Sequence, residues 1–397
     1  MATRRLVLTT ALLGALAAGP AVAQTPGVTA TEIKIGQTMP YSGPASAYGT
    51  IGKVESAFFA MINDKGGING RKVNLISLDD GYSPPKTVEQ IRRLVEQDQV
   101  LMIFQSLGTP SNTAIHKYMN AKKVPQLFVA TGATKWGDPE HFPWTMGWQP
   151  SYQTESHIYA KYLLQTKPDA KIGILYQNDD YGKDYVKGLK DGLGDKAAKM
   201  IVSEVSYEVT DPTIDSQIVT LKGSGADVFF NVTTPKFAAQ AIRKAYDIDW
   251  HPLHLLNNVS NSTGGVLEPA GLERSVGLVS AAYFKDPADP QYAQEPGMQE
   301  WVAFMKKYYP DGNLADGFNV YGYLVSQTLA QVLKQCGNDL SRENVMRQAA
   351  SLNMSLPLLF DGIKITTSPT DFHPIKQMRL EKFDGKRWVP FGEAVTG

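Results

Sequence analysis

Short apolar strands alternate with amphipathic helices along most of this 397-residue chain. A helix is expected over 53–64, because Val54, Phe58 and Met61 recur at helical spacing and form one apolar face. Mostly apolar runs at 73–78, 101–104 and 126–129 are typical of buried strands. Strands that alternate with helices of about ten residues predict βαβ units and parallel sheets, so the fold class is α/β.

The alternation falls into two series, which predict two doubly wound parallel-sheet lobes. An irregular stretch at 133–152 separates them, and a second series of helices and strands covers 155–256. Further helices at 298–308, 319–334 and 342–351 precede a β-like tail at 363–391. A chain of this length suggests about two domains. We expect one lobe from 28–147 plus 280–360 and the other from 148–279 plus 361–397.

The first 23 residues are predicted to be a signal peptide. Arg4 and Arg5 precede an apolar run at 6–18, and small residues lead to Ala23. The alternative is a membrane anchor, which needs about 20 apolar residues, whereas Gly19 and Pro20 interrupt this run. We therefore expect cleavage after Ala23 and an extracytoplasmic protein.

Composition and motifs exclude several classes of function. The 39 basic and 39 acidic residues balance, which argues against a nucleic-acid partner. The single cysteine, Cys336, excludes an intrachain disulfide and a Cys-based zinc site. The chain contains no hydrolase elbow, zinc-protease helix, phosphate-binding loop or dinucleotide fingerprint, so we expect no enzyme, cofactor or metal. An exported hydrolase remains an alternative, with Ser106 and His116 as its candidate pair.

Three loops that follow predicted strands are rich in small and hydroxyl residues, at 40–49, 105–112 and 130–134. Ligands of parallel sheets bind beyond the carboxyl ends of the strands. Glycine N–H groups and hydroxyls in such loops suit a carboxylate, although the same residues also form ordinary turns.

At these loops the sequence resembles the periplasmic solute-binding proteins of branched-chain amino acid ABC transporters, the leucine/isoleucine/valine-binding type. The resemblance covers nearly the whole chain after the signal peptide and rests on the segments 33–36, 42–44, 48–49, 62–70, 79–80, 124–125, 132–134 and 180–182. It implies a type I periplasmic binding fold, with two lobes joined by three crossovers that close on a small-molecule ligand. It also implies a periplasmic monomer whose partner is an ABC permease.

The resemblance also implies positions for the ligand. A first carboxylate-binding loop falls on Leu107, Gly108 and Thr109, where Gly108 replaces the usual serine and leaves its backbone N–H. A second turn falls on Gly132 and Thr134, with Thr131 as a competing donor because the segment is longer than usual. Tyr48 and Tyr181 match positions where aromatic residues of the family line the cleft, and Trp148, Gln149 and Tyr152 lie where the second lobe begins. Tyr41 and Trp136 are further aromatic residues that we consider as candidates for contact with a flat ligand.

The main departure from the family is Asn258. Amino-acid-binding members are expected to place an acidic residue near this position to neutralise the ligand's ammonium, and an amide cannot supply that charge. We therefore expect a ligand with a carboxylate or amide but no α-ammonium, and the aromatic residues favour an aromatic or other flat acid. A branched-chain amino acid binder and an exported sensor that uses the same cleft remain alternatives.

Overall fold

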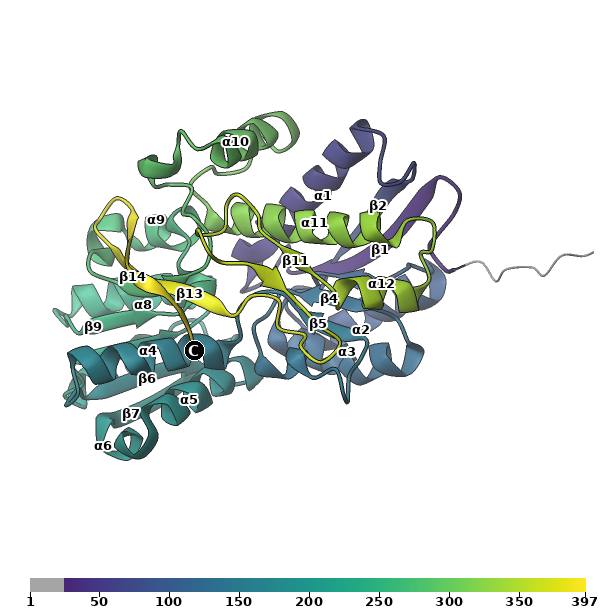
Figure 1. The fold of residues 1–397 in the computed structure, drawn as a ribbon. Coiled ribbons are helices and arrows are strands. Elements are labelled where there is room, and N and C mark those ends of the chain that lie inside the picture. The colour runs from purple at the N-terminus through teal and green to yellow at the C-terminus, as the bar shows by residue number, and fades with distance from the viewer. Residues whose placement is uncertain (1–24) are drawn as a thin grey trace, which may run out of the picture.

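The computed structural model describes residues 25–397 as two α/β lobes, each built on its own sheet (Figure 1). The predicted signal peptide lies outside the described residues. The sheet of the first lobe is wholly parallel and has the order β2-β1-β3-β4-β5. Its strands are β1 (Glu32–Met39), β2 (Lys72–Asp79), β3 (Ile103–Phe104), β4 (Gln126–Val129) and β5 (Thr145–Gly147).

The sheet of the second lobe has the order β14-β13-β10-β9-β8-β6-β7. Five of its strands are parallel, namely β6 (Ile172–Gln177), β7 (Ile201–Tyr207), β8 (Val228–Val232), β9 (Leu253–Leu256) and β10 (Val279–Ala282). The C-terminal tail adds two antiparallel edge strands, β13 (Gln377–Phe383) and β14 (Trp388–Thr396). The predicted β-like tail therefore makes this sheet mixed rather than wholly parallel.

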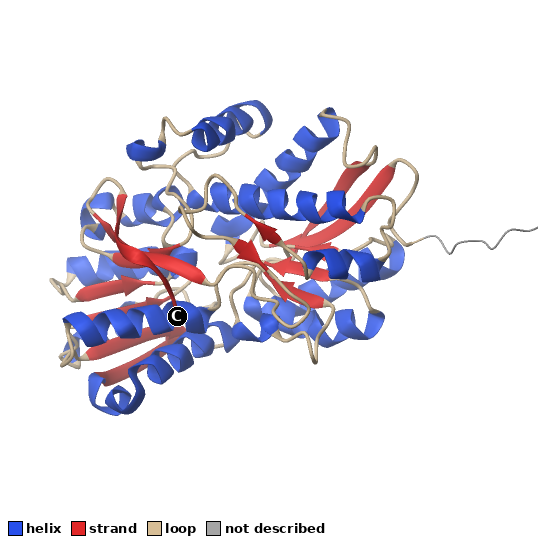
Figure 2. Ribbon diagram, viewed as in Figure 1, coloured by secondary structure: helices blue, strands red, loops and turns tan. Residues whose placement is uncertain are grey.

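Helices cover both faces of each sheet (Figure 2). Because both faces are covered, inner strands such as β4 and β8 are buried at every position. The longer helices are α1 (Gly49–Asp64), α2 (Pro84–Arg92), α3 (Thr109–Lys122), α4 (Tyr152–Thr166), α5 (Asp180–Leu193), α7 (Asp215–Gly223), α8 (Pro235–Asp247), α10 (Pro296–Tyr308), α11 (Gly317–Cys336) and α12 (Arg342–Ala349). Short elements are α6 (Ala197–Met200), α9 (Glu268–Ala270), β11 (Asn353–Met354) and β12 (Ile365–Thr366).

The chain passes between the lobes three times: after β5, after β10, and between α12 and β13. Between the second and third passages, α10–α12 pack on the first lobe, where the Arg342 side chain donates to the carbonyls of Val100 and Leu101. The second and third passages lie side by side, since the N–H of Lys285 donates to the carbonyl of Leu358 at 2.8 Å.

Two expected lobe boundaries differ from the structure. Strand β10 pairs with β9 and β13, so the second passage follows Ala282 rather than residue 279. The segment after 360 does not enter the second lobe at once, because β12 pairs with β11 and Thr367 donates to the carbonyl of Ala349. Pairing with the second sheet begins only at Gln377.

Helices α1 and α11 approach each other closely at Gly322. A Cβ atom at this position would lie 2.4 Å from Cγ1 of Val54 and 3.1 Å from the carbonyl oxygen of Ile51. Glycine is therefore required by the close helix contact, since an added methyl group would force the two helices apart.

We expect Gly322→Ala to lower the free energy of unfolding by about 1–3 kcal/mol through overpacking. Gly223→Ala in α7 is the matched control, because its Cβ would meet no atom within 4 Å. That variant should be neutral or gain up to about 1 kcal/mol from helix propensity. Urea unfolding of both variants checks the pair, and equal stabilities would contradict the packing argument.

Candidate functional site

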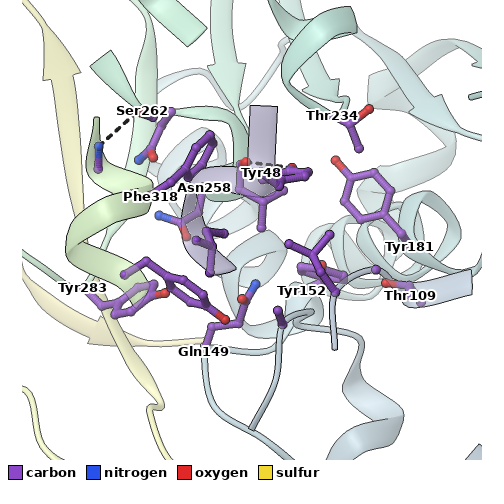
Figure 3. Close-up of a pocket in the computed structure, with 18 of the residues that line it drawn as sticks. Tyr48, Thr109, Gln149, Tyr152, Tyr181, Thr234, Asn258, Ser262, Tyr283 and Phe318 are labelled. Carbon is purple, nitrogen blue, oxygen red and sulfur yellow. Dashed lines mark hydrogen bonds between the residues drawn. The ribbon is translucent and has the colours of Figure 1, made fainter. Parts of the chain in front are cut away.

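A cavity of about 60 Å³ lies between the lobes, and loops from both sheets line it (Figure 3). Most lining residues follow the carboxyl end of a strand, as in the loops after β1 to β6 and β8 to β10. These residues are Tyr48, Tyr82, Leu107, Gly108, Thr109, Ala130, Gln149, Tyr152, Tyr181, Thr234, Asn258, Val259, Asn261, Ser262, Tyr283 and Phe284. Helix α1 adds Ile51, and the start of α11 adds Gly317, Phe318 and Tyr321.

The cavity lies at the point in each sheet where the strand order reverses. In the first sheet β1 lies between β2 and β3, and the following loops supply Tyr48 and Thr109. In the second sheet β6 lies between β7 and β8, and the following loops supply Tyr181 and Thr234. Open α/β sheets bind ligands at such switch points, so this cavity is the candidate binding site.

Eight of the fourteen residues predicted from the sequence line this cavity: Tyr48, Leu107, Gly108, Thr109, Gln149, Tyr152, Tyr181 and Asn258. The other six, Tyr41, Thr131, Gly132, Thr134, Trp136 and Trp148, are not among its lining residues.

The aromatic residues among these six are used in packing. The Tyr41 hydroxyl forms a hydrogen bond of 2.6 Å with Ser77 Oγ behind α1, and the ring lies against Gly52. Trp148 is completely buried and donates from Nε1 to Thr328 Oγ1 at 3.0 Å. Trp148 is therefore part of the core, as is Trp136, and the half-buried Tyr41 packs against it.

Thr134 contacts the other lobe instead of the cavity. Its N–H and hydroxyl both donate to Asp184 Oδ2, at 2.8 and 2.9 Å. The neighbouring Lys135 forms an ion pair of 2.6 Å with Asp180, which lies in helix α5 together with Asp184. These contacts hold the two lobes together beside the cavity, so Thr134 has no hydroxyl proton left for a ligand there.

Thr131 lies immediately behind Thr109, with 2.6 Å between the two hydroxyl oxygens. The Thr131 oxygen accepts from the Tyr152 hydroxyl at 3.1 Å and from the N–H of Ala133 at 3.3 Å. Its own proton is therefore directed to Thr109, since both of its lone pairs are in use. This arrangement leaves the Thr109 proton for the Tyr152 oxygen beside it or for a ligand in the cavity, which both residues line.

Gly108 supports Thr109 through its backbone. Its φ of 102° is in a region that favours glycine, and a Cβ would lie 2.6 Å from the Tyr82 ring. The N–H of Gly108 donates to the carbonyl of Ala130 at 3.3 Å, which differs from the expectation that it would face the ligand. Within the described chain, the N–H of Thr109 at the start of α3 has no hydrogen-bond partner and is the available backbone donor. Gly132 also acts through its backbone, because its carbonyl accepts from the N–H of Tyr152 at 2.7 Å.

The lining contains no Asp, Glu, Lys, Arg or His among the residues that the structure describes. Its tyrosines are neutral near pH 7, because burial raises the pKa of Tyr152 to about 12 and that of Tyr48, Tyr181 and Tyr321 well above 10. The site therefore offers hydroxyls, amides and backbone groups, without a formal charge.

Asn258 is held by its neighbours, and a carboxylate lies behind it. Its Nδ2 donates to the carbonyl of Ala281 at 2.8 Å, and its N–H donates to Glu155 Oε1 at 2.7 Å. Glu155 also accepts from the hydroxyls of Tyr159 and Tyr185 at 2.8 and 2.6 Å. This buried carboxylate does not line the cavity, and three donors already occupy its oxygens.

The start of α3 presents its positive dipole end to the cavity without a capping side chain, through Gly108 and Thr109. The start of α11, by contrast, is capped, because the Asp316 side chain accepts a hydrogen bond from the N–H of Phe318 at 3.0 Å. Of these two helix starts, α3 is thus the one that can favour an anion.

Several hydrogen bonds join the lobes at the cavity, including one from the N–H of Gly317 to Ser262 Oγ at 3.0 Å. The Tyr48 hydroxyl donates to the carbonyl of Val259 at 2.9 Å (Figure 3), and Gln177 Nε2 donates to the Tyr82 hydroxyl at 3.4 Å. The first lobe supplies Tyr48 and Tyr82, and the second supplies their partners. The structure is therefore in a closed conformation.

Several lining residues were not predicted from the sequence. Tyr82, Thr234, Ser262 and Tyr283 each follow a strand, so the rule that ligands bind at strand ends could have identified them. Residues 317, 318 and 321 come from a helix about 35 residues beyond β10, which only the folded arrangement of the lobes brings to the site.

The pair considered for a hydrolase does not form. Ser106 Oγ bonds to the N–H and hydroxyl of Thr38 at 3.1 and 3.0 Å, whereas His116 is stacked on Phe142. No hydrogen bond joins Ser106 to His116 in the described chain, and neither residue lines the cavity. Across residues 25–397, no group of His, Cys, Asp and Glu side chains could hold a metal ion. No helix in that range is long and apolar enough to cross a bilayer.

Glu155 generates a prediction about pH. Burial raises its pKa from 4.5 to about 7, against the opposing effect of its hydrogen bonds. The folded protein therefore holds this proton more tightly than the unfolded chain does. The resulting stabilisation is complete below about pH 4.5 and is lost as the pH rises to about 7.

Glu155→Gln keeps the shape and removes the titration. Between pH 5 and 7.5 the wild type should lose more free energy of unfolding than this variant, by on the order of 3 kcal/mol. Urea unfolding at both pH values checks the difference. The same pH dependence in both proteins would show that Glu155 does not titrate in this range.

Comparisons with known proteins agree with this architecture. The family described as periplasmic binding protein matches residues 32–387. The Leu/Ile/Val-binding protein homolog 7 of Brucella abortus (strain 2308) is 24% identical, over 97% of this chain and 96% of that protein.

Two solved structures share the fold. A branched chain amino acid ABC transporter from Thermus thermophilus with bound valine has a TM-score of 0.83 at 16% identity, over 92% of this chain and 97% of that chain. A fatty acid ABC transporter substrate-binding protein from Thermomonospora curvata has a TM-score of 0.77 at 22% identity, over 94% of this chain and 95% of that chain. The chain belongs to the periplasmic binding protein family and has the type I fold of its branched-chain amino acid type.

Proposed function

We propose that this protein is the periplasmic solute-binding component of an ABC importer and captures a small carboxylate that lacks an ammonium group. The observation that carries the proposal is the uncharged lining of the interlobe cavity, with Asn258 where amino-acid-binding members are expected to have an acid. Closure of the lobes around the ligand forms the surface that a permease recognises. The protein acts as a monomer and without chemistry on its ligand.

The carboxylate binds at the start of α3. The Thr109 hydroxyl and the unpaired N–H of the same residue both donate to an anionic oxygen there, and the helix dipole adds to this attraction. These neutral donors compensate the carboxylate for the water that it loses on entry.

An ammonium group has no comparable partner. The carboxylate of Glu155 lies behind Asn258 and already accepts three hydrogen bonds. Burial of an uncompensated ammonium is costly, so the lining selects against α-amino acids. The solved structures similar to this protein include one with bound valine, an amino acid, and one of a fatty acid transporter's substrate-binding protein. The lining of the present cavity favours an acid without an amino group.

The dimensions of the cavity favour a flat or short ligand. Its volume of about 60 Å³ is less than half of the roughly 150 Å³ of an apolar cavity that accepts benzene. The rings of Tyr152 and Tyr181, with centroids 5.3 Å apart, would lie beside the apolar part of the ligand. An aromatic acid therefore requires the lobes to separate, and a short aliphatic acid requires less separation.

A small neutral amide is a second candidate, because the same uncharged lining imposes no penalty on an uncharged ligand. The amide would use the Thr109 donors through its carbonyl oxygen. It differs from the acid in one measurable way, since a carboxylate with a pKa near 4 to 5 loses affinity when it is protonated at low pH.

A thermal-shift panel on residues 24–397 tests the proposed function. The panel contains leucine, valine and phenylalanine, their counterparts without the amino group, benzoate, and the matching amides. Acids without an ammonium should raise the melting temperature by at least a few degrees at 100 times Kd. Stabilisation by leucine or valine alone would overturn the proposal. Stabilisation by amides alone would show that the ligand is a neutral amide rather than a carboxylate.

Thr109→Val should weaken binding of the best acid in this panel by about 1–3 kcal/mol, because it removes the hydroxyl donor. Thr131→Val should have a smaller effect, since it leaves both Thr109 donors in place and removes only the oxygen that supports Thr109 and Tyr152 from behind. Thr134→Val is the comparison variant and should lose less affinity than Thr109→Val by calorimetry, because its hydroxyl donates to Asp184 and its N–H keeps a second bond to the same oxygen. A larger loss at Thr134 than at Thr109 would mean that the anion binds at the other turn.

A further inference from the structure

Three polar residues gather around Trp148 where the chain passes between the lobes. Gln149 follows Trp148 directly in the first passage, and Tyr283 lies at the start of the second. Tyr321 comes from α11, and the rings of Tyr283 and Tyr321 lie 5.9 and 5.4 Å from the Trp148 ring. All three line the cavity, and we call Gln149, Tyr283 and Tyr321 the crossover cluster.

The polar atoms of the crossover cluster have no partners in the described part of the protein. The side-chain amide of Gln149 forms no hydrogen bond, although only 7% of the residue is exposed. The Tyr321 hydroxyl is buried without a partner, and the Tyr283 hydroxyl forms no hydrogen bond. In Figure 3 the Gln149 side chain extends toward the space that the labelled residues enclose.

Neighbouring groups do not satisfy these atoms. Gln105 lies near enough to Tyr321 to offset part of the pKa rise that burial gives the phenol, yet the Tyr321 hydroxyl and Gln105 Oε1 are both left without a hydrogen-bond partner. Other tyrosines of the cavity are paired, as Tyr48 is with Val259 and Tyr152 with Thr131. Buried polar groups are normally hydrogen-bonded, so a concentration of free ones in a single cavity indicates a partner from outside the chain.

We propose that the crossover cluster binds a second, uncharged oxygen of the ligand, so that the ligand is a hydroxy acid or an oxo acid. This inference rests on the proposed function, in which the carboxylate binds at Thr109. The Gln149 amide and the Tyr321 phenol can both donate to a carbonyl oxygen, and each can also accept from a hydroxyl. An ammonium or a second carboxylate would find no opposite charge in the cluster.

Specificity follows from the same free groups. An acid that lacks the second oxygen leaves buried donors unpaired, and sites built for a hydroxyl or carbonyl strongly reject such analogues. The protein should therefore prefer 4-methyl-2-oxopentanoate or 2-hydroxy-4-methylpentanoate to 4-methylpentanoate, or 4-hydroxybenzoate to benzoate. The preference in at least one of these pairs should be tenfold or more.

Calorimetry with these matched pairs tests the inference on the mature chain. Tyr321→Phe and Gln149→Met should reduce the preference for the oxygenated acid at least fivefold and should still bind the plain acid, which also confirms that they fold. Tyr323→Phe is the matched control on the same helix. Tyr323 packs against Phe58 and Phe304 outside the cavity, and this variant should keep the full preference.

The outcomes separate the inference from the function on which it rests. If plain and oxygenated acids bind equally, the cluster binds only water; the inference is then wrong and the proposed function stands. If Tyr323→Phe lowers the preference as much as Tyr321→Phe does, the cluster is not responsible and the inference is also wrong. If no acid binds to the wild type, both fail.

Discussion

The structure depends on the direction of its strands. Parallel strands place all of their carboxyl ends on one edge of a sheet, and here the corresponding edges of two sheets meet at one cavity. Loops after nine strands converge there, although they are separated by up to 240 residues in the sequence. The three passages between the lobes keep the edges opposed, and the hydrogen bond from Tyr48 to Val259 closes them. A ligand in this cavity therefore contacts both lobes and stabilises their closed arrangement.

The lining of the site is uncharged, and the carboxyl groups nearest to it lie one layer of residues behind the lining. Glu155 lies behind Asn258 and Asp316 behind Ser262, each fixed by several hydrogen bonds. Burial raises the pKa of both carboxyls, to about 7 and about 6, which makes them poor partners for an external cation. The surface that remains consists of neutral donors and acceptors, which is the basis of the proposed selection against an ammonium group.

The sequence was sufficient to predict the alternating α/β architecture, because strand and helix periodicities differ and most elements are buried on one or both faces. It was not sufficient to locate the second and third passages between the lobes, since β10 and β12 are short strands and the pairing of β10 with β13 joins distant parts of the chain. Within the site, the sequence predicted which strand-end loops line the cavity. It did not predict which hydroxyl in those loops faces the cavity, because the partner of Thr134 is Asp184, a residue of the other lobe. The contributions of α11 required the folded structure for the same reason.

The most direct test of this account is a crystal structure of the protein with the acid that binds it best. The account predicts one molecule in the interlobe cavity, with its carboxylate within 3.2 Å of the Thr109 hydroxyl and N–H, the distance of an ordinary hydrogen bond, and with no charged side chain in contact. A ligand bound elsewhere, or one whose ammonium group lies against Asn258, would contradict the account.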